Sequence, residues 1–198
     1  MGQVVFYDND ILIWDKEAGE DSEKLPELLA AEYGTLFVVH RLDKPVRGLI
    51  LYARNKASAA VLSRQVTDGG LEKEYMCKAY GHFDEPKGEM ADLLFKDRAS
   101  GKTFVVKRER KGVKQAKLLY EVIGEETNPE GDIISTVRIK LITGRSHQIR
   151  VQFGSRKHPL IGDGKYGSRI KGDIELKSVM LRFIHPADGK MREFRSEL

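Results

Sequence analysis

The chain has 198 residues, 40% of them hydrophobic and 32% charged, which is typical of one compact domain that buries most of its apolar side chains. The single cysteine, Cys77, excludes an internal disulfide and agrees with a reducing compartment. No apolar run approaches the roughly 20 residues of a membrane-spanning helix, and no basic region followed by an apolar stretch opens the chain. We therefore expect a cytoplasmic protein without a membrane partner.

The net charge of +4 is divided unevenly along the chain. Residues 1–40 carry nine acidic and two basic side chains, a net charge of −7, and residues 41–198 carry 21 acidic and 32 basic side chains, a net charge of +11. Lysine and arginine release counterions from phosphates, so a basic main body favours a polyanionic partner such as a nucleic acid. A solvated, lysine-rich surface is the alternative that charge alone leaves open.

The first half of the chain reads as short strands and two helices. Asn55 is a suitable N-cap for the second helix, and Gly34 a suitable stop for the first, whose first turn contains Pro26. In chain order we predict a hairpin (4–7 and 11–14), a helix (22–33), a short strand (37–39), a strand (49–53) and a helix (56–67). Between the third and fourth strands, Pro45 and Gly48 keep residues 40–48 an irregular loop.

The second half is richer in strands. The predicted elements are strands at 72–80, 116–123 and 133–142, a short helix at 146–153, and a closing hairpin at 178–185 and 191–194. Strands and helices do not alternate strictly, so we predict an α+β fold on a mixed, largely antiparallel sheet flanked by helices.

Two polar segments stand out among these elements, HRLDKPVRG at residues 40–48 and LITGRSHQIR at residues 141–150. The first places Asp43 close to an arginine and a glycine-containing turn. The second gathers Arg145, His147, Gln148 and Arg150 after an apolar, β-rich run. A carboxylate in one segment and guanidinium groups in the other indicate an ionised nucleophile held beside a polyanion.

Competing kinds of site find little support in the sequence. One cysteine and five scattered histidines do not make a zinc site, because no two of them have metal-ligand spacing. The segment GDGKYG at residues 162–167 lacks the Walker pattern and is read as a turn. Cys77 beside Met76 is read as a small core residue. We expect no metal.

At these motifs the chain resembles a known family. HRLDKPVRGLILYARN at residues 40–55 resembles the catalytic motif of the RluA family of RNA pseudouridine synthases, roughly HRLD-x-x-T-S-G. KEY at residues 73–75 and LITGRSHQIRVQFGSRKHPLIGDGKYG at residues 141–167 resemble later family motifs in the same order. The likeness runs from about residue 4 to residue 194. It implies a single pseudouridine synthase catalytic domain over residues 1–198, with a central RNA-binding cleft. Some family members carry an N-terminal S4-like domain, which we do not expect here.

The resemblance also implies an activity and roles for three residues. A pseudouridine synthase is an isomerase that breaks the bond between N1 and the ribose, rotates the base and rejoins it through C5, so we expect no cofactor. By resemblance, Asp43 is the nucleophile or base that starts glycosidic cleavage, and it must be ionised. Arg145 is its ion-pair partner. Tyr75 stacks on the target base, a role that we weight above proton abstraction.

The implied partner is a structured RNA, either ribosomal or transfer RNA, and we expect the protein to act as a monomer. The target base must leave its helical stack before Asp43 can reach it, and Arg41 corresponds to the arginine that holds the flipped nucleotide. The remaining candidates for RNA contact are Arg47, His147, Gln148, Arg150, Lys165 and the basic run 107–114. Within this set we expect His147 and Gln148 to orient their loop by hydrogen bonds. For the run 107–114 we favour a solvated, mobile loop, with contact to RNA as the alternative.

One position departs from the family pattern. Where the family has Thr-Ser before the glycine, this chain has Val46-Arg47. The two absent hydroxyls are the groups expected to brace the catalytic loop, and Arg47 adds a cation that we expect to touch the RNA backbone. Without an accessory domain, recognition would rest on a compact stem-loop read by its local shape.

Each of these residues, considered alone, also has a purely structural interpretation. Asp43 alone would be a turn or cap residue, Tyr75 a core residue, and Arg145 a structural ion pair. Two other functions also remain open. A non-catalytic RNA-binding or RNA-folding module would bind RNA even after Asp43→Ala and would yield no product. An unrelated small-molecule enzyme using Asp43 and Arg145 would show no affinity for RNA.

Overall fold

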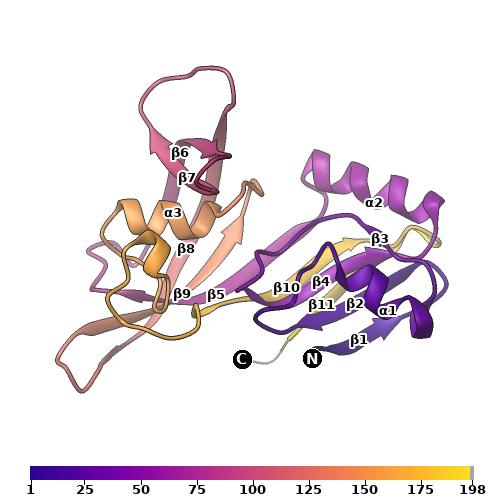
Figure 1. Cartoon of the computed structure of the whole chain (residues 1–198), viewed down its shortest axis with the longest axis horizontal. Coiled ribbons are helices and arrows are strands. Elements are labelled where there is room, and N and C mark those ends of the chain that lie inside the picture. Colours follow the sequence, from indigo (N-terminus) through magenta and orange to yellow (C-terminus); the bar gives the residue numbers. More distant parts are fainter. Residues whose placement is uncertain (197–198) are drawn as a thin grey trace. The chain divides into compact units, whose positions relative to one another are not determined.

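The computed structural model describes residues 1–196 and divides into two compact units (Figure 1). The first unit comprises Met1–Glu74 together with the chain from Lys177 onward, and the second comprises Tyr75–Leu176. Strands β5 (Glu72–Tyr80) and β10 (Leu176–Ile184) carry the chain across the two boundaries. Helices and mostly antiparallel strands confirm the predicted α+β class. A single catalytic domain with a central cleft stays a prediction.

The first unit is built on a mixed sheet. Its strand order is β1-β2-β4-β10, with β3 on β4 and β11 on β10. Strands β2 and β4 pair antiparallel from Ile11↔Ala53 to Lys16↔Gly48, whereas β10 and β4 pair in parallel. The other strands of this unit are β1 (Gln3–Tyr7), β2 (Ile11–Lys16), β3 (Phe37–Val38), β4 (Arg47–Ala53) and β11 (Met191–Arg195), and its helices are α1 (Leu25–Tyr33) and α2 (Lys56–Asp68).

The two helices of this unit cover opposite faces of the sheet. Leu49 and Leu51 alternate along β4 and pack in one cluster with Leu62 of α2. On the other face, the ring of Trp14 lies 6.4 Å from the ring of Tyr33 in α1. Burial on both faces explains why β4 reads as a continuous apolar run rather than an alternating one.

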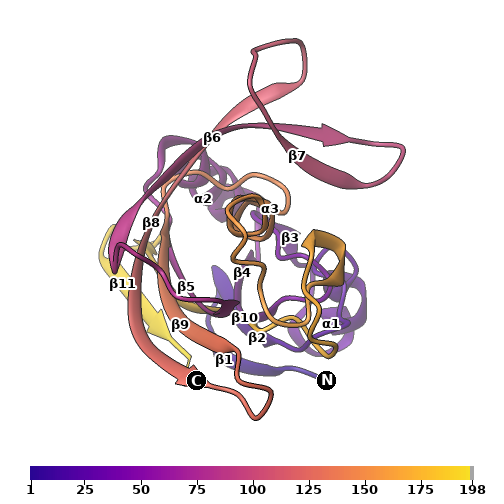
Figure 2. The same cartoon turned by 90° about the vertical axis from the view of Figure 1, so that its left-hand side faces the viewer.

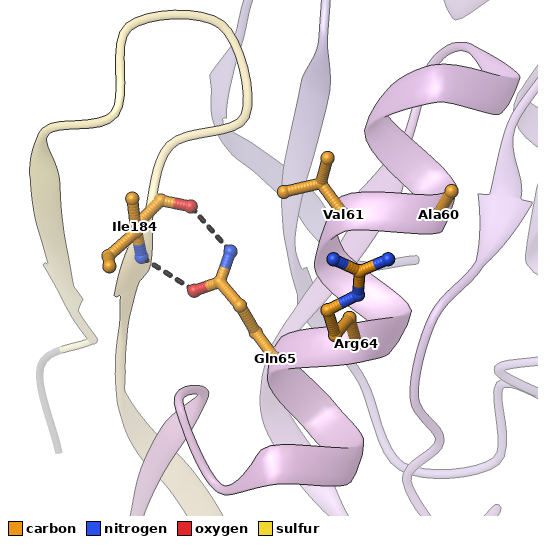
Figure 3. Close-up of a pocket in the computed structure, with 5 residues that line it drawn as sticks. All are labelled: Ala60, Val61, Arg64, Gln65 and Ile184. Carbon is orange, nitrogen blue, oxygen red and sulfur yellow. Dashed lines mark hydrogen bonds between the residues drawn. The ribbon is translucent and has the colours of Figure 1, made fainter.

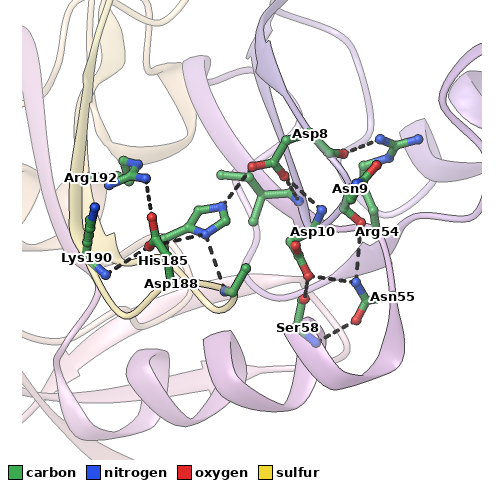
Figure 4. Close-up of polar contacts among 12 residues, drawn as sticks. Asp8, Asn9, Asp10, Arg54, Asn55, Ser58, His185, Asp188, Lys190 and Arg192 are labelled. Atoms are coloured by element: carbon green, nitrogen blue, oxygen red, sulfur yellow. Dashed lines mark hydrogen bonds and ion pairs between the residues drawn. The ribbon is translucent and has the colours of Figure 1, made fainter.

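A polar cluster fixes the ends of these elements (Figure 4). Buried His185, just after β10, has its Nε2 atom 3.0 Å from Oδ2 of Asp8 in the β1–β2 turn. In the same turn, Asp10 accepts hydrogen bonds from Ser58 Oγ (2.6 Å) and Asn55 Nδ2 (2.9 Å). Asn55 also caps α2 as predicted, because its Oδ1 accepts from Ser58 N at 2.8 Å. These contacts join the β1–β2 turn to the turn after β10 and to the N-terminus of α2.

The second unit is a twisted antiparallel sheet in the order β5-β9-β8-β6-β7. The remaining strands are β6 (Lys87–Asp97), β7 (Lys102–Val106), β8 (Val113–Thr127) and β9 (Ile133–Leu141). Helix α3 (Gln148–Ser155) packs Val151 against Leu94 and Ala116 of this sheet. Figure 2 shows the loop between β7 and β8 projecting from the unit.

Most predicted elements are present, with informative differences. Helix α1 begins at Leu25 rather than residue 22, because Ser22 turns its hydroxyl to the carbonyl of Leu42 instead of capping the helix. Helix α3 begins at Gln148 rather than residue 146, because His147 has a left-handed backbone. Strands β6 and β7 were not predicted. Among the residues that the structure describes, no helix is long and apolar enough to cross a membrane.

Candidate active site

Asp43 lies on a loop of the first unit that is anchored on both sides. Its neighbours Leu42 and Val46 are buried in the core, while Asp43 itself is half-buried. A turn closes the loop, since the backbone N–H of Val46 donates to the carbonyl of Asp43 at 2.9 Å. Two apolar anchors and a short turn therefore hold the backbone of Asp43 in place.

A buried lysine holds the same loop through a hydrogen bond to its backbone. Lys16, the last residue of β2, is 1% exposed, and its ammonium donates to the carbonyls of Glu17 (2.9 Å), Glu20 (3.0 Å) and Lys44 (3.0 Å). Burial lowers the pKa of Lys16 to about 8. The carbonyl of Lys44 also accepts from Gly19 N at 2.9 Å. The residue after Asp43 is therefore tied to the β2–α1 connection.

The carbonyl before Asp43 is satisfied by a hydroxyl. Ser22 Oγ donates to Leu42 O at 3.0 Å, and the Tyr52 hydroxyl holds Ser22 by donating to its carbonyl at 2.8 Å. The carbonyls of residues 42, 43 and 44 thus all accept hydrogen bonds. Lys16 and Ser22 therefore brace this loop, and the side chain of Val46 fills the core.

Two further motif residues are structural. Gly48 has φ +106°, and a Cβ there would lie 2.2 Å from the carbonyl oxygen of Ser178 on the neighbouring strand, so only glycine fits. His40 is buried, and its Nε2 accepts a hydrogen bond from Leu51 N at 3.0 Å. Burial lowers the pKa of His40 to about 3, so the imidazole stays neutral.

The two arginines of this motif lie in different settings. Arg41 is exposed, and its Nη1 is 3.1 Å from Oε2 of Glu23, an exposed ion pair that contributes little to stability. Arg47 is half-buried at the first position of β4. Arg41 is thus available at the surface beside the Asp43 loop.

In the second unit, a buried amide shapes the loop that carries Arg145. Gln148 is 3% exposed, and its Oε1 accepts from Thr143 Oγ1 (2.8 Å) and from Arg145 N (3.0 Å). Its Nε2 donates to Lys117 O at 3.0 Å. Arg145 is exposed and its Nε donates to Gln115 O at 2.9 Å. Gln148 has the loop-orienting contacts that the sequence predicted for it.

Arg150 has a different environment from the one expected. It is 5% exposed and forms a bidentate pair with Asp163, with Nε and Nη2 at 2.6 and 2.8 Å from the two carboxylate oxygens. Its guanidinium also lies 5.2 Å from the ring centroid of Tyr166. A buried pair of this kind is structural, so an RNA contact by Arg150 is not part of our proposal. Lys165 is exposed, and its Nζ donates to Gly101 O at 2.8 Å.

Tyr75 is the first residue of the second unit and is buried on β5. Lys73 is the first residue of the KEY motif, and burial lowers the pKa of its ammonium group. Asp43 lies in the first unit and Arg145 in the second, so their ion pair stays a prediction.

Sequence reasoning missed Lys16, Ser22, Asp163 and Tyr166. The available signals were weak. Lys16 is the one cation in the apolar strand ILIWDK, Ser22 stood only at the start of a predicted helix, and Asp163 and Tyr166 belong to GDGKYG, which was interpreted only as a turn. A small apolar pocket is lined by Ala60, Val61, Arg64, Gln65 and Ile184 (Figure 3). None of the predicted site residues lines it.

A family model described as RNA pseudouridylate synthase matches residues 10–155, which include the Asp43 loop and the Arg145 loop. The chain belongs to this family. A synthase of Vibrio parahaemolyticus, named dual-specificity RNA pseudouridine synthase RluA, is 31% identical over 96% of this chain and 80% of its own length. An uncharacterized RNA pseudouridine synthase of Bacillus subtilis, YhcT, is also 31% identical, over 92% of this chain and 64% of its own length. These matches place the chain in the RluA family of isomerases.

Solved structures support the fold of this pseudouridine synthase. Human RNA pseudouridylate synthase domain containing 1 superimposes with a TM-score of 0.85 at 23% identity, covering 100% of this chain and 84% of its own. Human RNA pseudouridylate synthase domain containing 4 gives a TM-score of 0.80 at 19% identity, covering 98% of this chain and 88% of its own. The predicted pseudouridine synthase fold is confirmed.

Proposed function

We propose that this synthase converts specific uridines of a structured ribosomal or transfer RNA into pseudouridine, with Asp43 starting glycosidic cleavage. The observation that carries the proposal is the Asp43 loop. It presents a half-buried carboxylate on a backbone whose carbonyls at residues 42–44 are all hydrogen-bonded. A reacting group held in this way loses little entropy when the substrate arrives.

The proposed reaction needs only groups that the chain supplies. The bond between C1′ and N1 breaks, the base rotates, and C1′ bonds to C5, while the C5 proton leaves and N1 gains a proton. Uridine and pseudouridine therefore have the same atoms, and no electrons are exchanged. The Asp43 carboxylate acts as the nucleophile: it bonds to C1′ as the bond to N1 breaks, and it is released when C1′ bonds to C5. Arg145 is its ion-pair partner, and Tyr75 stacks on the base. The nucleotide is flipped out of its helix, and the exposed Arg41 holds it.

The second unit supplies a cationic surface for the RNA backbone. Exposed Lys107, Arg108, Arg110, Lys111 and Lys114 occupy or adjoin the loop between β7 and β8. The guanidinium of Arg110 lies 4.5 Å from the ring centroid of Phe95, which keeps part of this loop against β6. We assign phosphate contacts to this loop, to Arg47 and to Lys165. The enzyme acts in the cytoplasm as a monomer, without a membrane partner.

Comparing RNA from three strains tests this function. One strain lacks the protein, one is complemented by the wild type and one by Asp43→Asn, and pseudouridine is mapped by carbodiimide labelling and primer extension. A site that is lost on deletion and restored only by the wild type identifies the substrate RNA. If no site changes in ribosomal or transfer RNA, the proposal fails. Restoration by Asp43→Asn would show that the reaction does not need the Asp43 carboxylate, and would refute the role that we propose for it.

A further inference from the structure

His147 has a backbone conformation that its side chain alone does not explain. It lies between Arg145 and the start of α3, with φ +53° and ψ +24°, the left-handed region that residues with a Cβ rarely adopt. The backbone nevertheless continues directly into helical hydrogen bonds, since Val151 N donates to the carbonyl of His147 at 2.9 Å. Such a conformation persists only where its surroundings hold it.

The Tyr166 side chain contacts the imidazole of His147. The Tyr166 hydroxyl lies 2.7 Å from Nδ1 of His147, and the two rings meet edge to face with centroids 5.7 Å apart. The same hydroxyl accepts a hydrogen bond from the backbone N–H of Thr103 at 2.9 Å. Burial raises the pKa of Tyr166, so its hydroxyl stays protonated beside the imidazole.

Strand β7 also contacts the Arg145 loop directly, through Thr103. The side-chain hydroxyl of Thr103, which is buried, donates to the carbonyl of Ser146 at 3.1 Å. Residues 146 and 147, directly after Arg145, are thus fixed from outside the loop by Thr103 and Tyr166. Gln148 fixes the loop from inside, because its side chain accepts from Arg145 N and its own N–H donates to Arg145 O at 3.1 Å.

We propose that Tyr166 and Thr103 are positioning residues that hold the Arg145 loop in its catalytic conformation. The role rests on the proposed function, because it matters for the rate only if Arg145 serves the reaction. Both side chains act through the loop, by their hydrogen bonds to residues 146 and 147. Both lie in the second unit, and Thr103 belongs to β7, the strand that leads into the loop that we assign to RNA binding.

Four conservative variants test this role by the single-turnover rate of pseudouridine formation and by RNA affinity. Tyr166→Phe removes one hydroxyl and keeps the ring, and Thr103→Val keeps the shape of the side chain. We expect each to slow the reaction about 10-fold at nearly unchanged RNA affinity, since a small displacement of a catalytic group costs rate rather than binding. Thr103→Ser retains the hydroxyl and should keep the wild-type rate. Tyr80→Phe, which loses a 2.7 Å hydrogen bond to Asp132 elsewhere in the unit, is the matched control.

Two more measurements separate positioning from general stability. Hydrogen exchange of residues 143–148 should quicken in Tyr166→Phe and not in Tyr80→Phe. The double variant Tyr166→Phe/Thr103→Val should be little slower than either single variant, because both changes release one loop. Wild-type rates in Tyr166→Phe and Thr103→Val, or an equal loss in Thr103→Ser, would overturn the proposal. A wild-type enzyme inactive on every RNA would refute the proposed function instead, and the exchange experiment would still decide whether Tyr166 holds the loop.

Discussion

At the scale of single residues, the support of Asp43 depends on a charge buried under its loop. The Lys16 ammonium is removed from water, which is costly unless hydrogen bonds replace the lost hydration. Three carbonyls do so, and one of them belongs to Lys44, the residue after Asp43. The lysine therefore connects a β-strand to the reacting loop without entering the reaction.

Replacing Lys16 by methionine keeps a long unbranched chain and removes the donors. We expect Lys16→Met to lower the rate of pseudouridine formation about 10-fold or more, because the Asp43 loop loses one of its fixed points. RNA affinity should stay close to that of the wild type. Lys24→Met, at an exposed lysine of the same segment, is the control. A wild-type rate in Lys16→Met would show that the loop does not need this lysine.

His40 makes stability depend on pH in a defined direction. Its pKa is about 3 in the folded protein and about 6.5 when unfolded, so below pH 6.5 the unfolded chain binds a proton that the folded chain does not. The free energy of unfolding should fall by up to about 1.4 kcal/mol per pH unit between pH 6 and pH 4 from this group. Denaturant unfolding of the wild type and His40→Gln at several pH values measures the difference. The prediction would be contradicted if the free energy of unfolding had the same pH slope in both proteins, or if the NMR signals of the His40 imidazole titrated near pH 6.5.

At the scale of elements, the hairpin of β6 and β7 shows where sequence patterns stop being informative. The sequence KGEMADLLFKD does not alternate cleanly, because β6 has charged residues on both sides and buries Met90 and Leu94. Its extended form comes from pairing with β8 over nine positions, a contact between segments distant in sequence. Helices α1 and α2, by contrast, carry local signals such as Pro26 and Asn55 and were predicted within three residues.

The loop between β7 and β8 should account for part of the salt dependence of RNA binding. We expect Lys107→Gln/Lys111→Gln to weaken binding and to reduce the slope of log affinity against log salt by about 1 to 2, as two phosphate contacts are lost. The control Lys24→Gln/Lys56→Gln removes the same charge from exposed positions of the first unit. Titration of labelled RNA at several salt concentrations measures both. Equal effects of the two pairs would mean that only net charge matters.

At the scale of the whole molecule, the sequence predicted the family, the fold and the order of the motifs. It could not assign roles that depend on distant contacts. Lys16 acts on a carbonyl 28 residues away, and Tyr166 binds Thr103 across 63 residues. Arg150 was read as a phosphate ligand because its charge is visible in the sequence, whereas its buried partner Asp163 becomes visible only in the folded chain.

The central claim is that Asp43 of this synthase isomerises uridine in RNA. The most direct measurement incubates purified protein with ribosomal and transfer RNA labelled with tritium at C5 of uridine, since that tritium is released when C5 bonds to the ribose. Wild type and the control Asp84→Asn, at an exposed aspartate, should release tritium as pseudouridine forms. Asp43→Asn should bind the RNA equally well and release tritium at least about 1,000-fold more slowly. Release by Asp43→Asn at the wild-type rate, or no release by the wild type from either RNA, would contradict the account.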